Sequence, residues 1–195
     1  MIAKIAFINR YKKSCLSYKI NRIARKRKME RKKTEMPINQ NIRPVTPNDM
    51  PALKKVIDAN GLFPSDMLDD MISDYFDRDN SSDFWLTYED HEPVAIAYCA
   101  PEKMTEGTWN LYLIAVHPDC QGKGRGTSMV RYIEKMLTKR GERLLLVETS
   151  GLTEFDRTRA FYRQCGFEEE ARIREFYQAG EDKIVFRKSL IDTKK

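Results

Sequence analysis

A glycine-rich segment, QGKGRGT at residues 121–127, constrains the fold more than any other feature, because it separates an apolar run from a helical pattern. The run before it, WNLYLIAV at 109–116, is too apolar for an edge strand and predicts a central one. After it, apolar residues recur at helical spacing over 128–139, and a second buried run follows at 144–147. The sequence therefore predicts a strand, a loop, a helix and a strand in succession, which is typical of α/β folds.

The rest of the chain from residue 41 continues this alternation. Thr46 and Ser65 are placed to cap two helices with apolar faces, and 84–88 and 94–99 predict a hairpin. The further predicted elements are a strand at 42–45, a helix around 159–164, and strands near 171–177 and 183–187. One α/β (α+β) domain is expected over residues 36–195, since 195 residues would crowd two full domains.

Charge divides the chain at residue 35. Residues 1–35 hold 13 Lys and Arg against 2 Asp and Glu, a net charge of +11, whereas the remaining residues carry a net charge of −5. A block of like charge with little apolar content stays solvated, so this part is interpreted as a basic tail. Three readings stay open: an upstream start with no function, an electrostatic arm for nucleic acid or anionic surfaces, and a targeting segment.

Composition excludes other classes of protein. No stretch approaches the roughly 18 apolar residues of a membrane span, and no secretory signal pattern is present. The four cysteines are far apart and have no histidine cluster beside them, so neither a metal site nor a disulfide framework is expected. A cytoplasmic protein without membrane association follows as the expectation.

The position of the glycine-rich segment suggests what it binds. At the start of a helix, unpaired backbone N–H groups and the positive end of the helix dipole favour an anion, and glycines let a phosphate approach the backbone. The segment matches neither the P-loop pattern nor the dinucleotide fingerprint, so a kinase or Rossmann function is disfavoured.

Two stretches of the chain carry a specific resemblance. AVHPDCQGKGRGTSMV, at 115–130, resembles the acetyl-CoA motif of the Gcn5-related N-acetyltransferases, the GNAT family, with Gln121, Gly124 and Gly126 in its [QR]-x-x-G-x-[GA] pattern. TRAFY at 158–162, followed by CGF, is similar to a later motif of that family. The resemblance covers about residues 41–190 and implies a mixed central sheet of six to seven strands flanked by about four helices.

The resemblance also implies a set of residues for acetyl-CoA. The pyrophosphate would lie on the loop, mostly on backbone amides, and the preceding strand would bind the pantetheine arm through its backbone. Phe155 and Asp156 stand where the family often has an asparagine for that arm, and Thr158 or Arg159 would substitute. The expected cofactor-binding residues are Ile114, Ala115, Val116, Gln121, Gly122, Lys123, Gly124, Arg125, Gly126, Thr127 and Thr158.

Catalytic roles follow from the same resemblance. Tyr162 stands where the family places a tyrosine that protonates the departing coenzyme A sulfur. Asn110 occupies the position of the glutamate base of histone acetyltransferases, which closes that route. Glu148, expected at the end of the 144–147 strand, resembles a glutamate of ribosomal-protein alanine acetyltransferases and is the expected base, with Tyr112 and a water chain as alternatives.

The expected function is transfer of an acetyl group from acetyl-CoA to a primary amine of a small molecule or protein, by direct attack in a ternary complex. The alternative is a non-catalytic module that binds acyl-CoA or is tethered to nucleic acid by the tail. The acidic domain favours a cationic acceptor. The sequence leaves the acceptor open, and both a monomer and a homodimer remain open.

Overall fold

The computed structural model describes residues 41–77 and 82–191. The predicted basic tail, residues 1–35, lies outside the described residues. Within the described ranges, no helix is long and apolar enough to cross a membrane. The predicted cytoplasmic location stays a prediction.

Seven strands form one mixed sheet in the order β1-β2-β3-β4-β5-β7-β6. The strands are β1 (Ile42–Pro44), β2 (Phe84–Asp90), β3 (Glu92–Pro101), β4 (Thr108–Val116), β5 (Leu144–Ser150), β6 (Glu168–Gln178) and β7 (Glu181–Ser189). The helices of the described residues are α2 (Met50–Asn60), α3 (Met67–Asp77), α4 (Arg125–Arg140) and α5 (Asp156–Gln164). The predicted mixed sheet of six to seven strands with about four helices is confirmed, and the apolar run at 109–116 is the central strand.

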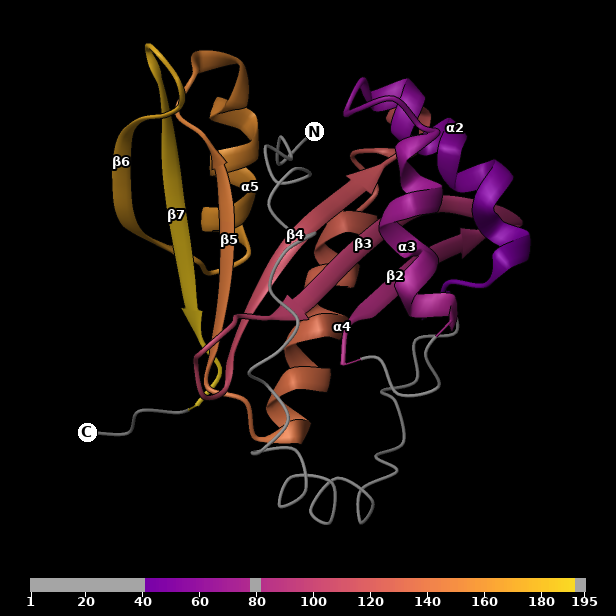
Figure 1. Ribbon diagram of the computed structural model, residues 1–195, viewed down its shortest axis with the longest axis horizontal. Helices are drawn as coiled ribbons and strands as arrows, with labels where there is room; N and C mark the ends of the chain where they lie inside the picture. Colours follow the sequence, from indigo (N-terminus) through magenta and orange to yellow (C-terminus); the bar gives the residue numbers. More distant parts are fainter. Residues whose placement is uncertain (1–40, 78–81, 192–195) are drawn as a thin grey trace.

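The helices cover both faces of the sheet (Figure 1). On one face, α2 and α3 pack through Leu53, Ile57 and Leu68 against Trp85 and Leu113 of the sheet. On the other face α4 and α5 enclose a larger core. Burial of apolar side chains on both faces stabilises the central strands, because each removes apolar surface from water. The core on the α4 side includes Met129, Ile133, Leu137, Val147, Tyr162, Phe167 and Phe186.

The sheet opens between β4 and β5. These parallel strands pair only over Thr108↔Leu144, Trp109↔Leu145 and Asn110↔Leu146. Beyond Asn110, β4 continues to pair with β3 and β5 continues to pair with β7, but the two strands separate from each other. Figure 1 shows them close together at one end and far apart at the other. The edge of β4 that faces β5 is therefore left without a strand partner within the described residues.

Two boundaries differ from the sequence-based prediction. Helix α4 begins at Arg125 rather than at residue 128, so the glycine-rich loop ends directly at the helix N-terminus, with Gly124 as the N-cap. Strand β5 runs to Ser150, so Glu148 lies inside the strand and not at its end. The predicted end of this strand was wrong because the apolar run stops at residue 147, whereas the strand continues by antiparallel pairing with β7. The additional pairs are Glu148↔Val185, Thr149↔Ile184 and Ser150↔Lys183.

Candidate functional site

The glycine-rich loop connects the open end of β4 to the N-terminus of α4. Gly122 and Gly124 have φ values of 73° and 74°, in the left-handed region that glycine adopts without strain. A Cβ atom at either residue would meet nothing within 4 Å, so open space lies beside this backbone. Lys123 between them is exposed. The loop therefore offers accessible backbone and one lysine at the positive end of a 16-residue helix.

The Arg125 side chain has three protein partners around the loop. Its guanidinium forms an ion pair with Asp90 at the β2–β3 turn and donates to the carbonyl oxygen of Cys120 at 3.0 Å. It also lies over the ring of Tyr88, 5.7 Å from the centroid. These contacts join the loop to the β2–β3 hairpin. We call this set of Arg125 contacts the brace. Lys123, in contrast, is exposed and is the accessible cation of the loop.

Gln121 is fixed by contacts with the end of β4. Its side-chain amide donates to the carbonyl oxygen of Val116 at 3.0 Å, and Asn60 donates to the same oxygen at 3.1 Å. Asn60 is the last residue of α2, so three elements meet at this carbonyl. The end of β4 and the start of the loop are thereby held in one geometry. The sequence pattern identified Gln121 but gave no sign that Asn60 would contact the same carbonyl.

The contacts of Arg125 predict that a substitution of its partner Asp90 weakens coenzyme A binding. Replacing Asp90 by asparagine removes the charge that compensates a guanidinium whose side chain is only 12% exposed. We expect coenzyme A affinity, measured by calorimetry, to fall about three- to tenfold, since the pair is partly screened by solvent. Asp119→Asn is the matched control, because that carboxylate is near the same loop and 89% exposed. Equal effects of both substitutions would contradict the brace.

Tyr162 lies on α5 with its ring inside the core. Phe161, Phe167 and Phe186 surround it, with ring centroids 5.4, 5.9 and 5.8 Å away. Burial raises the pKa of the Tyr162 phenol, so the hydroxyl keeps its proton at neutral pH. Phe186 pairs with Val147 of β5, one residue beyond the last β4–β5 pair. Tyr162 thus lies on the α4 face of the sheet, close to where β4 and β5 separate.

Glu148 and its surroundings form a charged cluster on the opposite face of β5. The Glu148 carboxylate accepts a hydrogen bond from Lys183 Nζ at 3.0 Å, and that ammonium lies 3.8 Å from the centroid of Phe176. Burial, together with the nearby charges of Glu148 and Glu181, raises the pKa of Tyr177. Glu148 is therefore already engaged by a lysine that is largely buried, which makes it a poor candidate for an unhindered base.

Thr158 and Arg159, expected to replace the family's asparagine in binding the pantetheine arm, are both buried. Arg159 donates to the carbonyl oxygens of Ser150 and Leu152, at 2.5 and 2.9 Å, and pairs with Asp156. It therefore connects the end of β5 to α5. Thr158 is 3% exposed on the same helix. Neither side chain projects freely toward the opening, so the predicted pantetheine contact of Thr158 remains a prediction.

Gly126 and Thr127 lie at the junction of α4 and α5. A Cβ atom on Gly126 would lie 3.4 Å from the Phe161 ring, in van der Waals contact, so this glycine packs closely against α5. The Thr127 hydroxyl hydrogen-bonds the Cys165 thiol. These residues hold the loop against α5 and contribute to the site through packing.

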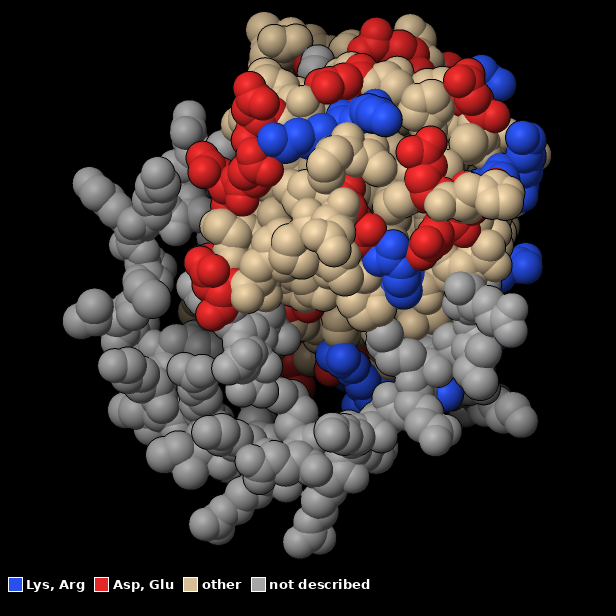
Figure 2. Space-filling view, turned by 90° about the vertical axis from the view of Figure 1, so that its right-hand side faces the viewer, with Lys and Arg blue, Asp and Glu red and all other residues tan. Residues whose placement is uncertain are grey.

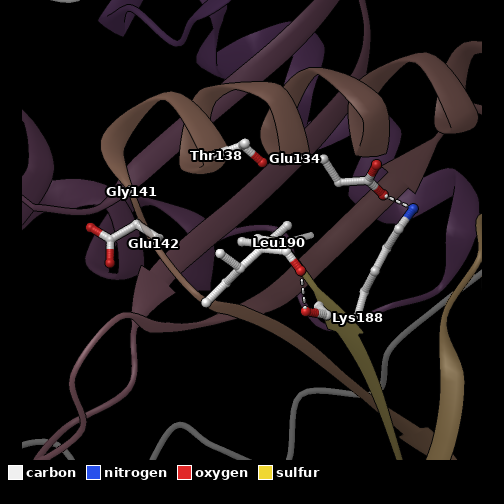
Figure 3. Close-up of a pocket in the computed structure, with 8 residues that line it drawn as sticks. Glu134, Thr138, Gly141, Glu142, Lys188 and Leu190 are labelled. Atoms are coloured by element: carbon white, nitrogen blue, oxygen red, sulfur yellow. Dashed lines mark hydrogen bonds and ion pairs between the residues drawn. The ribbon is translucent and has the colours of Figure 1, made fainter. Parts of the chain in front are cut away.

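Metal binding and one further cavity can be compared with this site within the described residues. No group of three or more His, Cys, Asp or Glu side chains in the described ranges could hold a metal ion. A cavity of about 390 Å³ lies at the C-terminal end of α4, where Lys188 Nζ is paired with Glu134 at 2.7 Å (Figure 3). A 16-residue helix is about 24 Å long, so this cavity is remote from the loop.

Comparisons with known proteins agree with this geometry. A family model described as acetyltransferase (GNAT) domain matches residues 80–169. A solved GNAT-family protein from Desulfovibrio desulfuricans is 31% identical, covers 77% of this chain and 98% of its own, and has a TM-score of 0.72. No curated protein matches the sequence.

Two more distant structures share the fold. A ribosomal-protein-alanine N-acetyltransferase from Brucella melitensis is 19% identical, with a TM-score of 0.63 and coverage of 76% of this chain and 98% of its own. A spermidine N-acetyltransferase from Vibrio cholerae, solved with CoA and spermine, is 14% identical, with a TM-score of 0.65 and coverage of 78% and 97%. On the similarity to the Desulfovibrio protein in particular, the chain belongs to the GNAT family and is an acetyltransferase.

Proposed function

We propose that this acetyltransferase transfers the acetyl group of acetyl-CoA to a primary amine by direct attack within a ternary complex. The observation that carries the proposal is the opening between β4 and β5, which leads from Asn110 to the glycine-rich loop. An extended thioester could lie along the unpaired edge of β4 with its phosphates on the loop. Chemistry would then occur where the two strands separate.

Each part of acetyl-CoA has a counterpart in this opening. The backbone of Gly122, Lys123 and Gly124 would hold the pyrophosphate, supported by the lysine charge. The backbone of β4 at Ile114, Ala115 and Val116 would pair with the pantetheine amides. The side chains of Asn60 and Gln121 already donate to the Val116 carbonyl oxygen. The backbone N–H groups and the other carbonyl oxygens of β4 would therefore bind the pantetheine amides.

Tyr162 would supply a proton to the coenzyme A thiolate. Its ring is locked by aromatic contacts, its hydroxyl is neutral, and it lies next to the start of the opening. A positioned acid of this kind lowers the barrier for a poor leaving group. Glu148 remains a candidate for the amine-binding face, although its ion pair with Lys183 disfavours it as the base.

The acceptor would be a cationic amine. Residues 36–195 carry a net charge of −5, and acidic side chains are spread over the α2 and α3 side of the molecule (Figure 2). Structural neighbours are named for spermidine, aminoglycosides and ribosomal-protein alanine. Amines of these classes form a reasonable first panel.

The test is thermal stabilisation by coenzyme A and acetyl-CoA. A ligand at about 100 times its Kd contributes about 2.7 kcal/mol to the free energy of unfolding, which raises Tm by about 5–10 °C in a chain of this size. Gly124→Glu is expected to remove most of this shift, because its carboxylate would stand where the phosphates bind. No shift for the wild-type protein would refute the proposed ligand.

Gly141→Glu is the matched control for backbone strain. Gly141 caps the other end of α4, has φ of 78°, and also has nothing within 4 Å of an added Cβ. Both substitutions place a glutamate in the left-handed region, so both should lower the Tm of the free protein. Only the change at Gly124 should abolish the ligand-induced shift. Loss of the shift in both variants would mean that the effect is strain alone.

A further inference from the structure

Glu102 lies at the start of the opening between β4 and β5, on the face covered by α2 and α3. It follows the last residue of β3, and its backbone N–H donates to the Thr108 carbonyl at 2.9 Å. Its side chain reaches along the sheet to Asn110, which belongs to the last β4–β5 pair. A carboxylate from the β3–β4 turn is thus brought to the point where the two strands separate.

Two side chains fix one oxygen of this carboxylate. Glu102 Oε1 accepts hydrogen bonds from Asn110 Nδ2 at 2.8 Å and from the Tyr112 hydroxyl at 2.9 Å. Among the described residues, no donor contacts Oε2. The two bonds to Oε1 hold the carboxylate in position, and the Glu102 residue is only half-buried.

A local irregularity of the sheet places Tyr112 beside Glu102. Tyr98 pairs with Leu113 and Cys99 pairs with Leu111, so Tyr112 is an extra residue in β4. Such a bulge turns a side chain away from regular alternation, and bulges occur frequently next to active sites. Tyr112 consequently shares the α2 and α3 face with Asn110.

A stack of three aromatic rings lies beside the Glu102 carboxylate. The Tyr112 ring stacks on Tyr98 with centroids 5.6 Å apart, and Tyr98 stacks on Trp85 at 4.3 Å. The Tyr98 hydroxyl donates to Asp83 at 3.1 Å, so each stacked tyrosine is hydrogen-bonded to a carboxylate. Aromatic faces and carboxylates both attract cations, and hydrogen bonding to a carboxylate makes each phenol more electron-rich.

We propose that Glu102, held by Asn110 and Tyr112 against the stacked tyrosines, binds the ammonium group of the acceptor amine and removes its proton. This inference rests on the proposed function, since it assigns the acceptor side of the same site. It identifies the ligand class as a protonated primary amine. The Tyr112 ring contributes the aromatic surface beside the carboxylate, since Tyr98 is stacked between Trp85 and Tyr112. Asp83, bound by the Tyr98 hydroxyl, is the proposed partner of a second cationic group of the acceptor.

The chemical step balances with the groups present. Glu102 takes one proton from the ammonium and becomes a neutral acid, which leaves a neutral amine. The amine nitrogen forms a bond to the thioester carbon, the carbon–sulfur bond breaks, and the thiolate takes the proton of Tyr162. The remaining extra proton on nitrogen returns to Tyr162 through water, and Glu102 releases its proton to solvent. Base and acid act from opposite faces of the sheet.

The comparison with Glu148 favours Glu102 as the proton acceptor. Glu148 is paired with a lysine ammonium at 3.0 Å, whereas both donors to Glu102 are neutral. An ammonium group of the acceptor would have to displace Lys183 from Glu148, but would not have to displace a cation from Glu102. The ion pair instead suits Glu148 to positioning Lys183 and the β6–β7 hairpin.

The test uses binding to the full chain saturated with coenzyme A. Putrescine is the cationic probe, the corresponding butanediol is the uncharged probe, and calorimetry gives both affinities. Wild-type protein should bind putrescine and not the diol, and Glu102→Gln should weaken putrescine binding about tenfold or more. Glu106→Gln, an exposed glutamate in the same turn, should leave it within twofold.

The outcomes separate this inference from the proposed function. Coenzyme A must raise the Tm of Glu102→Gln as it does for the wild type, which shows that the variant is folded and that the loop works. If wild-type protein binds coenzyme A but not putrescine, or if Glu102→Gln binds putrescine equally well, the acceptor site is not here. If coenzyme A itself fails to bind, the proposed function fails first.

A pH profile tests the proton-transfer part with whichever amine of the panel turns over. In the wild type, log(kcat/KM) should change little with pH around neutrality. In Glu102→Gln it should be lower by about 100-fold at neutral pH and recover as pH rises and the amine loses its proton to solvent. If the pH profile of the variant runs parallel to that of the wild type, Glu102 does not remove the proton and only binds the amine.

Discussion

Replacement of Tyr162 by phenylalanine is expected to lower kcat by about two orders of magnitude. A positioned general acid contributes about 10²–10⁴-fold, and here it would protonate a thiolate that otherwise must take its proton from water. The aromatic ring is retained, so contacts with Phe161, Phe167 and Phe186 persist and the fold should be unchanged. Release of free thiol measures kcat, and calorimetry measures coenzyme A affinity, which should stay within a few fold.

Tyr132→Phe is the matched control for this experiment. Tyr132 is 4% exposed in the same core, and burial raises its pKa in the same direction as for Tyr162. Removing its hydroxyl therefore tests whether any buried phenol affects turnover. We expect kcat of this variant to match the wild type. If Tyr162→Phe also retains wild-type kcat, the hydroxyl does not protonate the leaving group.

The pH dependence offers a second check on Tyr162. A general acid must be protonated to act, and burial raises the pKa of this phenol above its ordinary value. Turnover limited by this acid should consequently persist into alkaline solution and fall only above the raised pKa. The Tyr162→Phe variant should lack that alkaline decline.

Local patterns predicted the order of the elements well. The strand at 109–116 and the loop that follows it could be read from apolar runs and glycines, because these features depend on neighbours in sequence. The predicted acetyl-CoA role of the loop and the predicted acid role of Tyr162 came from the motif resemblance. The structure adds that the loop ends at Gly124 and that α4 begins at Arg125.

Contacts between distant segments could not be predicted in this way. The motif resemblance places Arg125 among the cofactor-binding residues, but it gives no sign of the ion pair with Asp90, 35 residues earlier. Glu102 had no signal of its own, because its role depends on Asn110 and on the bulge at Tyr112. Nor does sequence show where β4 and β5 separate, since β4 stays apolar past the last pair and β5 continues through polar residues after Val147.

Replacement of Phe186 by alanine is expected to produce the largest loss of stability among the substitutions considered. Phe186 is fully buried on β7 and contacts the ring of Tyr162. Deleting a buried phenylalanine ring costs about 3–5 kcal/mol, because apolar burial is lost and a cavity remains. For a chain of this size the corresponding fall in Tm is about 6–20 °C, measurable by calorimetry.

The same substitution connects packing to chemistry. Without Phe186, the Tyr162 ring loses one of its three aromatic neighbours, so the hydroxyl should be less well positioned and kcat should fall several-fold, even at a temperature where the variant is folded. Phe176→Ala is the control, since that ring is 47% exposed and its loss should lower Tm by less than about 4 °C. Phe186→Leu should recover part of both Tm and kcat by refilling the cavity. Recovery of Tm without kcat would mean that ring-to-ring contact, and not cavity volume, positions the Tyr162 hydroxyl.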